Sequence, residues 1–187
     1  MNKTYFELFG LEEKLNLDAK TLQKRFYALS KELHPDFHQG GTKAEQAQSL
    51  EASAQINQAF LTLKDKEKRL NYLMSLRLGE LSEAEKKQTP PELLAELMEI
   101  RERLDDFKRS PADEALRASL ESSLSDLRAR EKTLDAEIDA LSETFDAQPN
   151  RDAQNEILAR IRQTTLKRNF LRSLCRSIEA ELRPEEF

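Results

Sequence analysis

The sequence has no valine, only four glycines and a single cysteine in 187 residues. Valine is a typical strand residue, and no run of alternating β-branched residues replaces it, so a sheet is not expected. Cys175 has no cysteine to pair with in this chain, which fits a reducing cytosol. Only two histidines accompany it, without any metal-ligand spacing, so we expect no metal and no cofactor.

Long apolar runs, a basic charge balance and catalytic motifs are also missing. No apolar run approaches the ~20 residues that span a bilayer, and the N-terminus lacks the apolar core of a secretory signal. The formal net charge is −5, whereas nucleic-acid binding needs a basic surface. Gly-rich phosphate loops, H-E-x-x-H and G-x-S-x-G are absent. We therefore expect a cytoplasmic protein that is not an enzyme and binds neither nucleic acid nor a membrane.

The chain is rich in residues that favour helices: 38% are hydrophobic and 35% are charged. This composition predicts an all-α fold. Three long amphipathic patterns fill 91–187, with breaks at Ser110-Pro111 and at 148–150. Ser110 is predicted to cap the second of these helices, with Pro111 at its first position. The three patterns predict an antiparallel three-helix bundle, and we expect the chain to be a monomer.

The tripeptide His34-Pro35-Asp36 separates two other helical patterns. In the first, 18–33, apolar residues fall on one stripe and lysines on the opposite face. Pro35 ends this helix, because proline disfavours helical geometry at the preceding residue. The second pattern opens with a capping box at Thr42 and Glu45. The two helices are expected to pair antiparallel, with the tripeptide at their exposed tip.

The tripeptide alone is more often an ordinary turn. Here the segments before and after it favour a functional role. Leu8-Phe9-Gly10-Leu11 precedes it and Ile56-Asn57-Gln58-Ala59 follows it. In this order the segment resembles a J-domain, the module that docks on DnaK-type ATPase chaperones. With its helical second half, nearly the whole chain resembles the HscB (Jac-type) co-chaperones of iron–sulfur cluster biogenesis. We place the J-domain at 1–78, a linker at 79–90 and the scaffold-binding bundle at 91–187.

The resemblance implies that His34, Pro35 and Asp36 contact an HscA/DnaK-type chaperone and promote its ATP hydrolysis. Cations of the preceding helix would meet an acidic chaperone surface: Lys20, Lys24, Arg25 and Lys31. Without the tripeptide beside them, these cations would indicate only a solvated helix face. Many J-domains have lysine directly after the tripeptide, where this chain has Phe37, which puts one basic contact in doubt.

Two apolar residues of the first bundle helix, Leu94 and Met98, fall roughly 100–140° from its core stripe. On the third bundle helix, Phe170 is also off the main stripe. Acids border the first pair, namely Glu99, Glu102 and Asp106, and 92–106 holds six acids and two bases, a net charge of −4. An apolar patch rimmed by acids is typical of a protein interface. The alternative is that these apolar residues fill a seam against a neighbouring helix or the J-like segment.

The resemblance favours the interface, because in the HscB family these positions resemble those that bind the IscU-type scaffold. At one of the family's apolar positions this chain has Ala95, which offers less contact area. The leading hypothesis is an adaptor that presents the scaffold to the chaperone. Two alternatives remain: a J-domain co-chaperone for a different client, and a structural helical bundle whose tripeptide is only a turn. Cys175 falls on a core stripe and is expected to be a buried hydrophobe rather than a cluster ligand.

Overall fold

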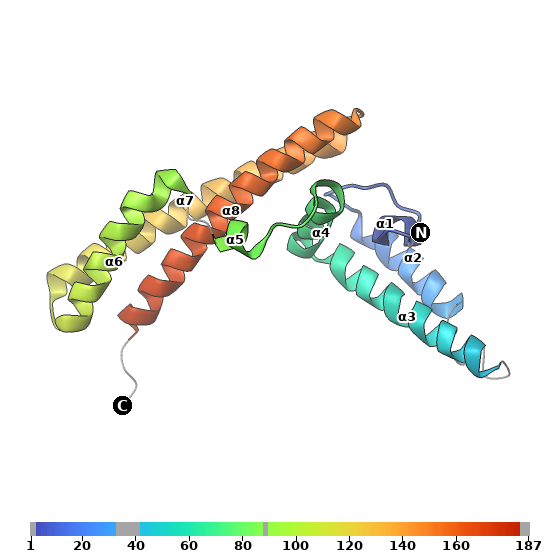
Figure 1. Cartoon of the computed structure of the whole chain (residues 1–187), viewed down its shortest axis with the longest axis horizontal. Helices are drawn as coiled ribbons and strands as arrows, with labels where there is room; N and C mark the ends of the chain where they lie inside the picture. Colours follow the sequence, from blue (N-terminus) through green and yellow to red (C-terminus); the bar gives the residue numbers. More distant parts are fainter. Residues whose placement is uncertain (1–2, 33–41, 88–89, 184–187) are drawn as a thin grey trace. The chain divides into compact units, whose positions relative to one another are not determined.

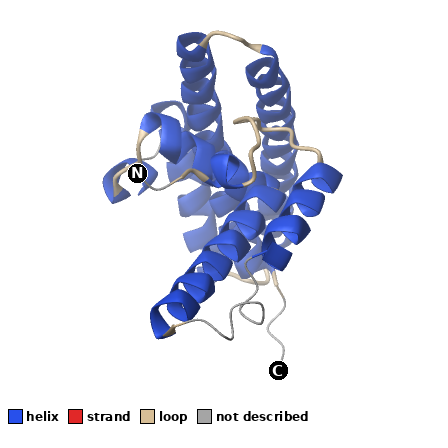
Figure 2. Ribbon diagram, turned by 90° about the vertical axis from the view of Figure 1, so that its right-hand side faces the viewer, coloured by secondary structure: helices blue, strands red, loops and turns tan. Residues whose placement is uncertain are grey.

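The computed structural model describes residues 3–32, 42–87 and 90–183. Every regular element in this part of the chain is a helix, which confirms the all-α prediction (Figure 2). His34, Pro35, Asp36 and Phe37 lie outside the described residues. The helices labelled in Figure 1 are α1 (Tyr5–Leu8), α2 (Ala19–Glu32), α3 (Lys43–Lys64), α4 (Lys66–Leu78), α5 (Glu83–Lys87), α6 (Leu94–Arg109), α7 (Glu114–Ala147) and α8 (Arg151–Leu182), and a 3-10 turn, η2 (Pro91–Leu93), precedes α6.

The chain divides into two compact units. The first combines residues 1–80 with 142–154, which are the turn between α7 and α8 and the helix ends beside it. The second combines 81–141 with 155–187. The predicted linker contains the short helix α5, opened by Ser82 as its cap. The domain boundaries read from the sequence stay predictions.

In the first unit, α2 and α3 lie side by side as a helical hairpin (Figure 1). Leu22 of α2 is buried, and the ring of Phe26 stacks on Phe60 of α3 with centroids 4.1 Å apart. The facing side of α3 contributes Ile56 and Leu63 to the core. This packing follows the apolar stripes of the two patterns, because burial of those stripes holds the helices together.

Helix ends in this unit are fixed by side chains that accept backbone hydrogen bonds. Thr42 and Glu45 form the predicted capping box at the start of α3. Asp65 accepts a bond of 2.9 Å from the Lys68 amide and so opens α4. Gly79 ends α4 with a φ of 79°, a conformation that glycine adopts at no steric cost.

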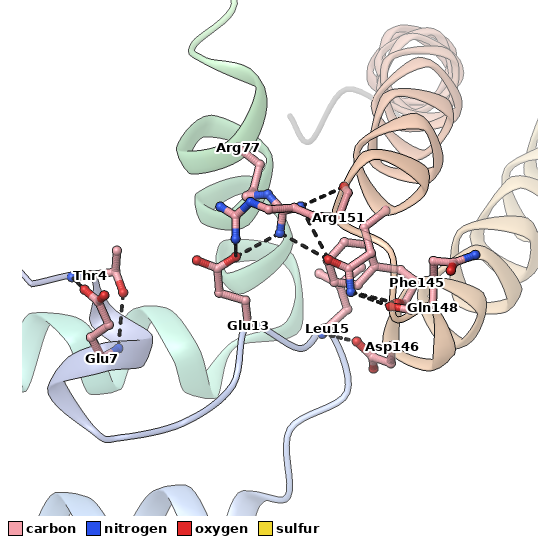
Figure 3. A network of polar contacts seen from close by, with 10 residues as sticks. Thr4, Glu7, Glu13, Leu15, Arg77, Phe145, Asp146, Gln148 and Arg151 are labelled. Carbon is pink, nitrogen blue, oxygen red and sulfur yellow. Dashed lines mark hydrogen bonds and ion pairs between the residues drawn. The ribbon is translucent and has the colours of Figure 1, made fainter.

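Residues 142–154 are joined to the rest of the first unit by a polar network (Figure 3). The Asp146 carboxylate accepts hydrogen bonds of 2.7 Å from the amides of Leu15 and Asn16. Arg77, whose side chain is only 2% exposed, makes a 2.9 Å ion pair with Glu13. Its guanidinium also lies over the Phe145 ring, 6.0 Å from the centroid. A turn distant in sequence is thus built into the N-terminal unit.

Replacing Arg77 by alanine is expected to lower the free energy of unfolding by about 2–3 kcal/mol. The change leaves the Glu13 carboxylate, only 25% exposed, without its close partner, and it uncovers one face of Phe145. Denaturant unfolding followed by circular dichroism measures the loss. Lys68→Ala, at an exposed position of the same helix, is the control and should change stability by no more than about 0.5 kcal/mol. Equal losses in both variants would contradict the role given to Arg77.

The second unit has a core shared by α6, α7 and α8. The predicted stripe of α6 is buried throughout, at Leu93, Leu97, Ile100, Leu104 and Phe107. The predicted start of the next helix is wrong: Ser110 ends α6, and α7 begins at Glu114. Asp113 is the cap, since its carboxylate accepts bonds of 2.9 and 3.0 Å from the amides of Ala115 and Leu116. The Ser110 amide is used by α6, donating to the Asp106 carbonyl at 3.0 Å.

Between α7 and α8 the seam of this unit is partly polar. Arg168, only 6% exposed, pairs with Asp135 at 3.0 Å, and Arg172 pairs with Glu131 at 2.7 Å. One turn further along α8, Cys175 is 4% exposed, as the core prediction requires. Burial raises the pKa of its thiol, so the thiolate needed for metal binding or nucleophilic attack is disfavoured.

Candidate docking surfaces

The basic face of α2 is the first predicted docking surface. Lys20, Lys24 and Lys31 are exposed on it. Arg25 is exposed as well, but its Nη1 donates to the carbonyl oxygens of Phe9 and Gly10 at 2.6 and 2.5 Å. The structure therefore ties Arg25 to the loop after α1, whereas the three lysines face solvent.

Gly10 makes these hydrogen bonds of Arg25 possible. Its φ is +57°, and a Cβ built at this position would lie 2.8 Å from Arg25 Nη1. Any other residue would meet both the left-handed backbone and the guanidinium. The shape of the loop therefore does not come from apolar packing alone: because residue 10 is a glycine, the Arg25 side chain can reach from α2 to the backbone of residues 9–10.

Sequence reasoning missed an aromatic residue on this helix. Tyr27 is 61% exposed, and its hydroxyl accepts a bond of 3.4 Å from Gln23 Nε2. Its ring is tilted against Phe26, with centroids 5.6 Å apart. The signal was available, because Tyr27 lies roughly 100° from the buried stripe position of Phe26. The basic helix thus also exposes an aromatic ring to solvent.

The second predicted docking surface lies on α6. Leu94 is 51% exposed and Met98 is 61% exposed, so neither fills the bundle interior. Ala95, between them, is exposed too. Phe170 differs: it is partly buried and packs against the core of the second unit. The three apolar residues are therefore not equivalent, and Leu94 and Met98 offer the free apolar area.

The acids around Leu94 fall into two groups. Glu92 and Glu96 are paired at 2.6 Å with bases of neighbouring helices, Lys167 and Arg130. The others lie further along α6: Glu99 and Glu102 are exposed, and Asp106 is half-buried beside Arg109 at 3.1 Å. Among the ion pairs of the described residues, none involves Glu99 or Glu102. These two carboxylates are the free charges beside Met98.

Comparisons with known proteins match both halves of the chain. Residues 4–72 match the DnaJ domain, and residues 89–179 match the HSCB C-terminal oligomerisation domain. A solved structure, the chaperone HscB from Vibrio cholerae, is 31% identical, with a TM-score of 0.54, over 95% of this chain and 96% of that chain. The chain belongs to the HscB family. Human co-chaperone HscB is similar as well, at 27% identity and a TM-score of 0.55, over 92% of this chain and 82% of that chain.

Membership in the HscB family confirms the resemblance read from the sequence. The chain is a J-domain co-chaperone of the type that serves iron–sulfur cluster assembly. The roles of its individual residues stay predictions, because family membership does not assign them. The expected monomer also stays a prediction.

The described part of the chain has neither a metal-ligand cluster nor a membrane-spanning helix. Its residues include no group of three or more His, Cys, Asp or Glu that could hold a metal ion. None of its helices combines the length and the apolar character needed to cross a membrane. Neither of the two matched domains is described as an enzyme. The expected absence of a cofactor stays a prediction.

Proposed function

We propose that this HscB-family chain binds an IscU-type scaffold protein and delivers it to an HscA/DnaK-type chaperone in the cytoplasm, where it stimulates that chaperone's ATPase. The observation that carries the scaffold part is the exposure of Leu94 and Met98, 51% and 61%, beside free carboxylates on α6. Solvent-exposed leucine and methionine at neighbouring turns of one helix are what a partner can desolvate.

The chaperone part is supported by the basic hairpin of the J-domain. Lys20, Lys24 and Lys31 give α2 an exposed positive face in a chain whose net charge is −5. A charged patch that is complementary to the partner's charge raises the association rate and orients the two proteins. It contributes less to the affinity of the complex. His34, Pro35 and Asp36 follow this face in sequence and are the residues proposed to act on the ATPase.

Two docking surfaces on one chain raise the effective concentration of scaffold at the chaperone. The test is the steady-state ATPase of a purified HscA-type chaperone with the chain, with an IscU-type scaffold, and with both. We expect the two together to stimulate hydrolysis more than the product of their separate effects. Stimulation by the chain that the scaffold never increases would favour a different client, and no stimulation at all would refute the chaperone part.

A further inference from the structure

The outer face of α3 carries little charge for this chain. Charged residues make up 35% of the sequence, but between residues 46 and 63 the only charged residue is Glu51. Depletion of charge, more than apolar area as such, distinguishes the centre of a protein interface from the remaining surface. Two large apolar residues of this stretch, Leu50 and Leu61, are 64% and 57% exposed. This stretch therefore has the composition of a contact surface.

The exposed residues of this face follow a seven-residue repeat. Steps of three and four residues alternate along one line, the α3 line, which consists of Ala47, Leu50, Ala54, Asn57 and Leu61. This is the a/d spacing of a coiled coil, in which such a line packs against a second helix. All five side chains are exposed. The buried side of α3 packs against α1, α2 and α4, so the core of the first unit does not use the α3 line.

The α3 line is complementary to itself when two copies of the helix run in opposite directions. Reversing the direction about the midpoint of the line exchanges position 50 with 61 and position 54 with 57. Two antiparallel copies therefore place Leu50 against Leu61 at both ends and Ala54 against Asn57 between them. A two-fold interface requires a surface that is complementary to itself in this way.

A lysine at the end of the repeat favours the antiparallel direction. Lys64 follows Leu61 by three residues, continues the a/d spacing and is exposed. Two parallel copies would bring their Lys64 ammonium groups together, and like charges that face each other across an interface are destabilising. Two antiparallel copies instead place each Lys64 beside Ala47 of the other copy. The same line therefore disfavours parallel pairing and accepts antiparallel pairing.

We propose that the outer face of α3 is a self-association surface, on which two copies of this chain pair through antiparallel α3 helices. From residue 47 to residue 61 the line is about 21 Å long, at 1.5 Å per residue. Two leucines per copy on that length cover much less than the about 800 Å² per partner of a standard interface. The pair is therefore weak and forms at high protein concentration, and the expected monomer is the state at low concentration.

Sedimentation velocity of the full chain, from about 10 μM to about 1 mM, tests this surface. Asn57→Leu replaces the polar residue of each line by leucine, and we expect self-association at least ten-fold tighter. Ala54→Glu, added to Asn57→Leu, places a carboxylate opposite that leucine and should reverse the gain. The control is Gln55→Leu, which adds a leucine at an exposed position of α3 outside the line and should leave self-association within two-fold. Circular dichroism checks the helix content of each variant.

Equal tightening by Asn57→Leu and Gln55→Leu would indicate general hydrophobic association and overturn the proposal. So would self-association that none of these variants changes, or an unmodified chain that remains monomeric at about 1 mM. Neither the scaffold nor the chaperone takes part in these measurements, so none of these outcomes alters the proposed function.

The direction of pairing is tested by disulfide cross-linking. A mixture of one chain carrying Leu50→Cys and another carrying Leu61→Cys should form a mixed disulfide dimer under mild oxidation, because antiparallel pairing brings these two positions together. Each variant alone should cross-link poorly, and Cys175 is buried and does not compete. Efficient linking of Leu50→Cys to itself would mean parallel pairing and overturn the proposal.

Discussion

Replacing Asp36 by asparagine is expected to abolish stimulation of an HscA/DnaK-type chaperone by this chain. The substitution keeps the size of the side chain and removes its negative charge. A hydrogen bond to a charged group contributes about 1.5–3 kcal/mol, so its loss lowers an equilibrium constant by roughly 10- to 150-fold. Single-turnover ATP hydrolysis by the chaperone, with saturating chain, measures the effect directly.

The matched control is Glu32→Gln, which removes one negative charge from the exposed last residue of α2. It changes the net charge by the same amount, so a purely electrostatic effect of total charge would appear in both variants. We expect the Glu32 variant to keep its stimulation, because that residue adds no positive charge to the basic face of α2. Stimulation retained by the Asp36 variant would remove the tripeptide from the mechanism.

How far the sequence predicts this fold depends on the range of each interaction. The caps at Thr42 and Asp65 were predictable because each side chain accepts a bond from a backbone amide three residues later. The prediction that Ser110 caps the next helix was wrong for an equally local reason. Asp113, three residues later, is a competing cap, and the Ser110 amide already donates a hydrogen bond within α6. Local signals therefore predict that a helix starts nearby more reliably than they choose between neighbouring caps.

Contacts between distant segments were not predictable from periodicity. Asp146 accepts from the amides of Leu15 and Asn16, 131 and 130 residues away in sequence. Arg25 reads as one cation of a basic face, and only the structure shows it donating to the carbonyls of residues 9 and 10. Spacing identifies which face of a helix a residue occupies, and it does not identify which backbone groups that residue will meet.

Residue spacing is also an incomplete guide to the docking surfaces. The angular positions of Leu94 and Met98 on α6 correctly predict that both lie outside the core, because α6 contacts its neighbours along one narrow stripe. The angular position of Phe170 predicts its burial less well, since α8 packs against two helices and its buried face is wider. The width of a buried face depends on how many neighbours cover it. One helical pattern does not contain that information.

The double change Leu94→Ser with Met98→Ser is expected to weaken binding of an IscU-type scaffold by roughly 30- to 140-fold. Each side chain is about half exposed, so covering the remaining area of both contributes about 2–3 kcal/mol. The helix should persist, because its buried stripe is unchanged and serine lowers helix propensity by only about 0.5 kcal/mol per residue. Calorimetric titration measures the affinity, and circular dichroism measures the helix content.

A matched control removes equally exposed apolar side chains from a different surface. Leu50 and Leu61 of α3 are 64% and 57% exposed, close to the values of Leu94 and Met98. The double change Leu50→Ser with Leu61→Ser removes similar apolar area from the first unit, so we expect the scaffold affinity to stay within two-fold. Equal weakening by both double variants would mean that general surface hydrophobicity, and not the α6 surface, attracts the scaffold.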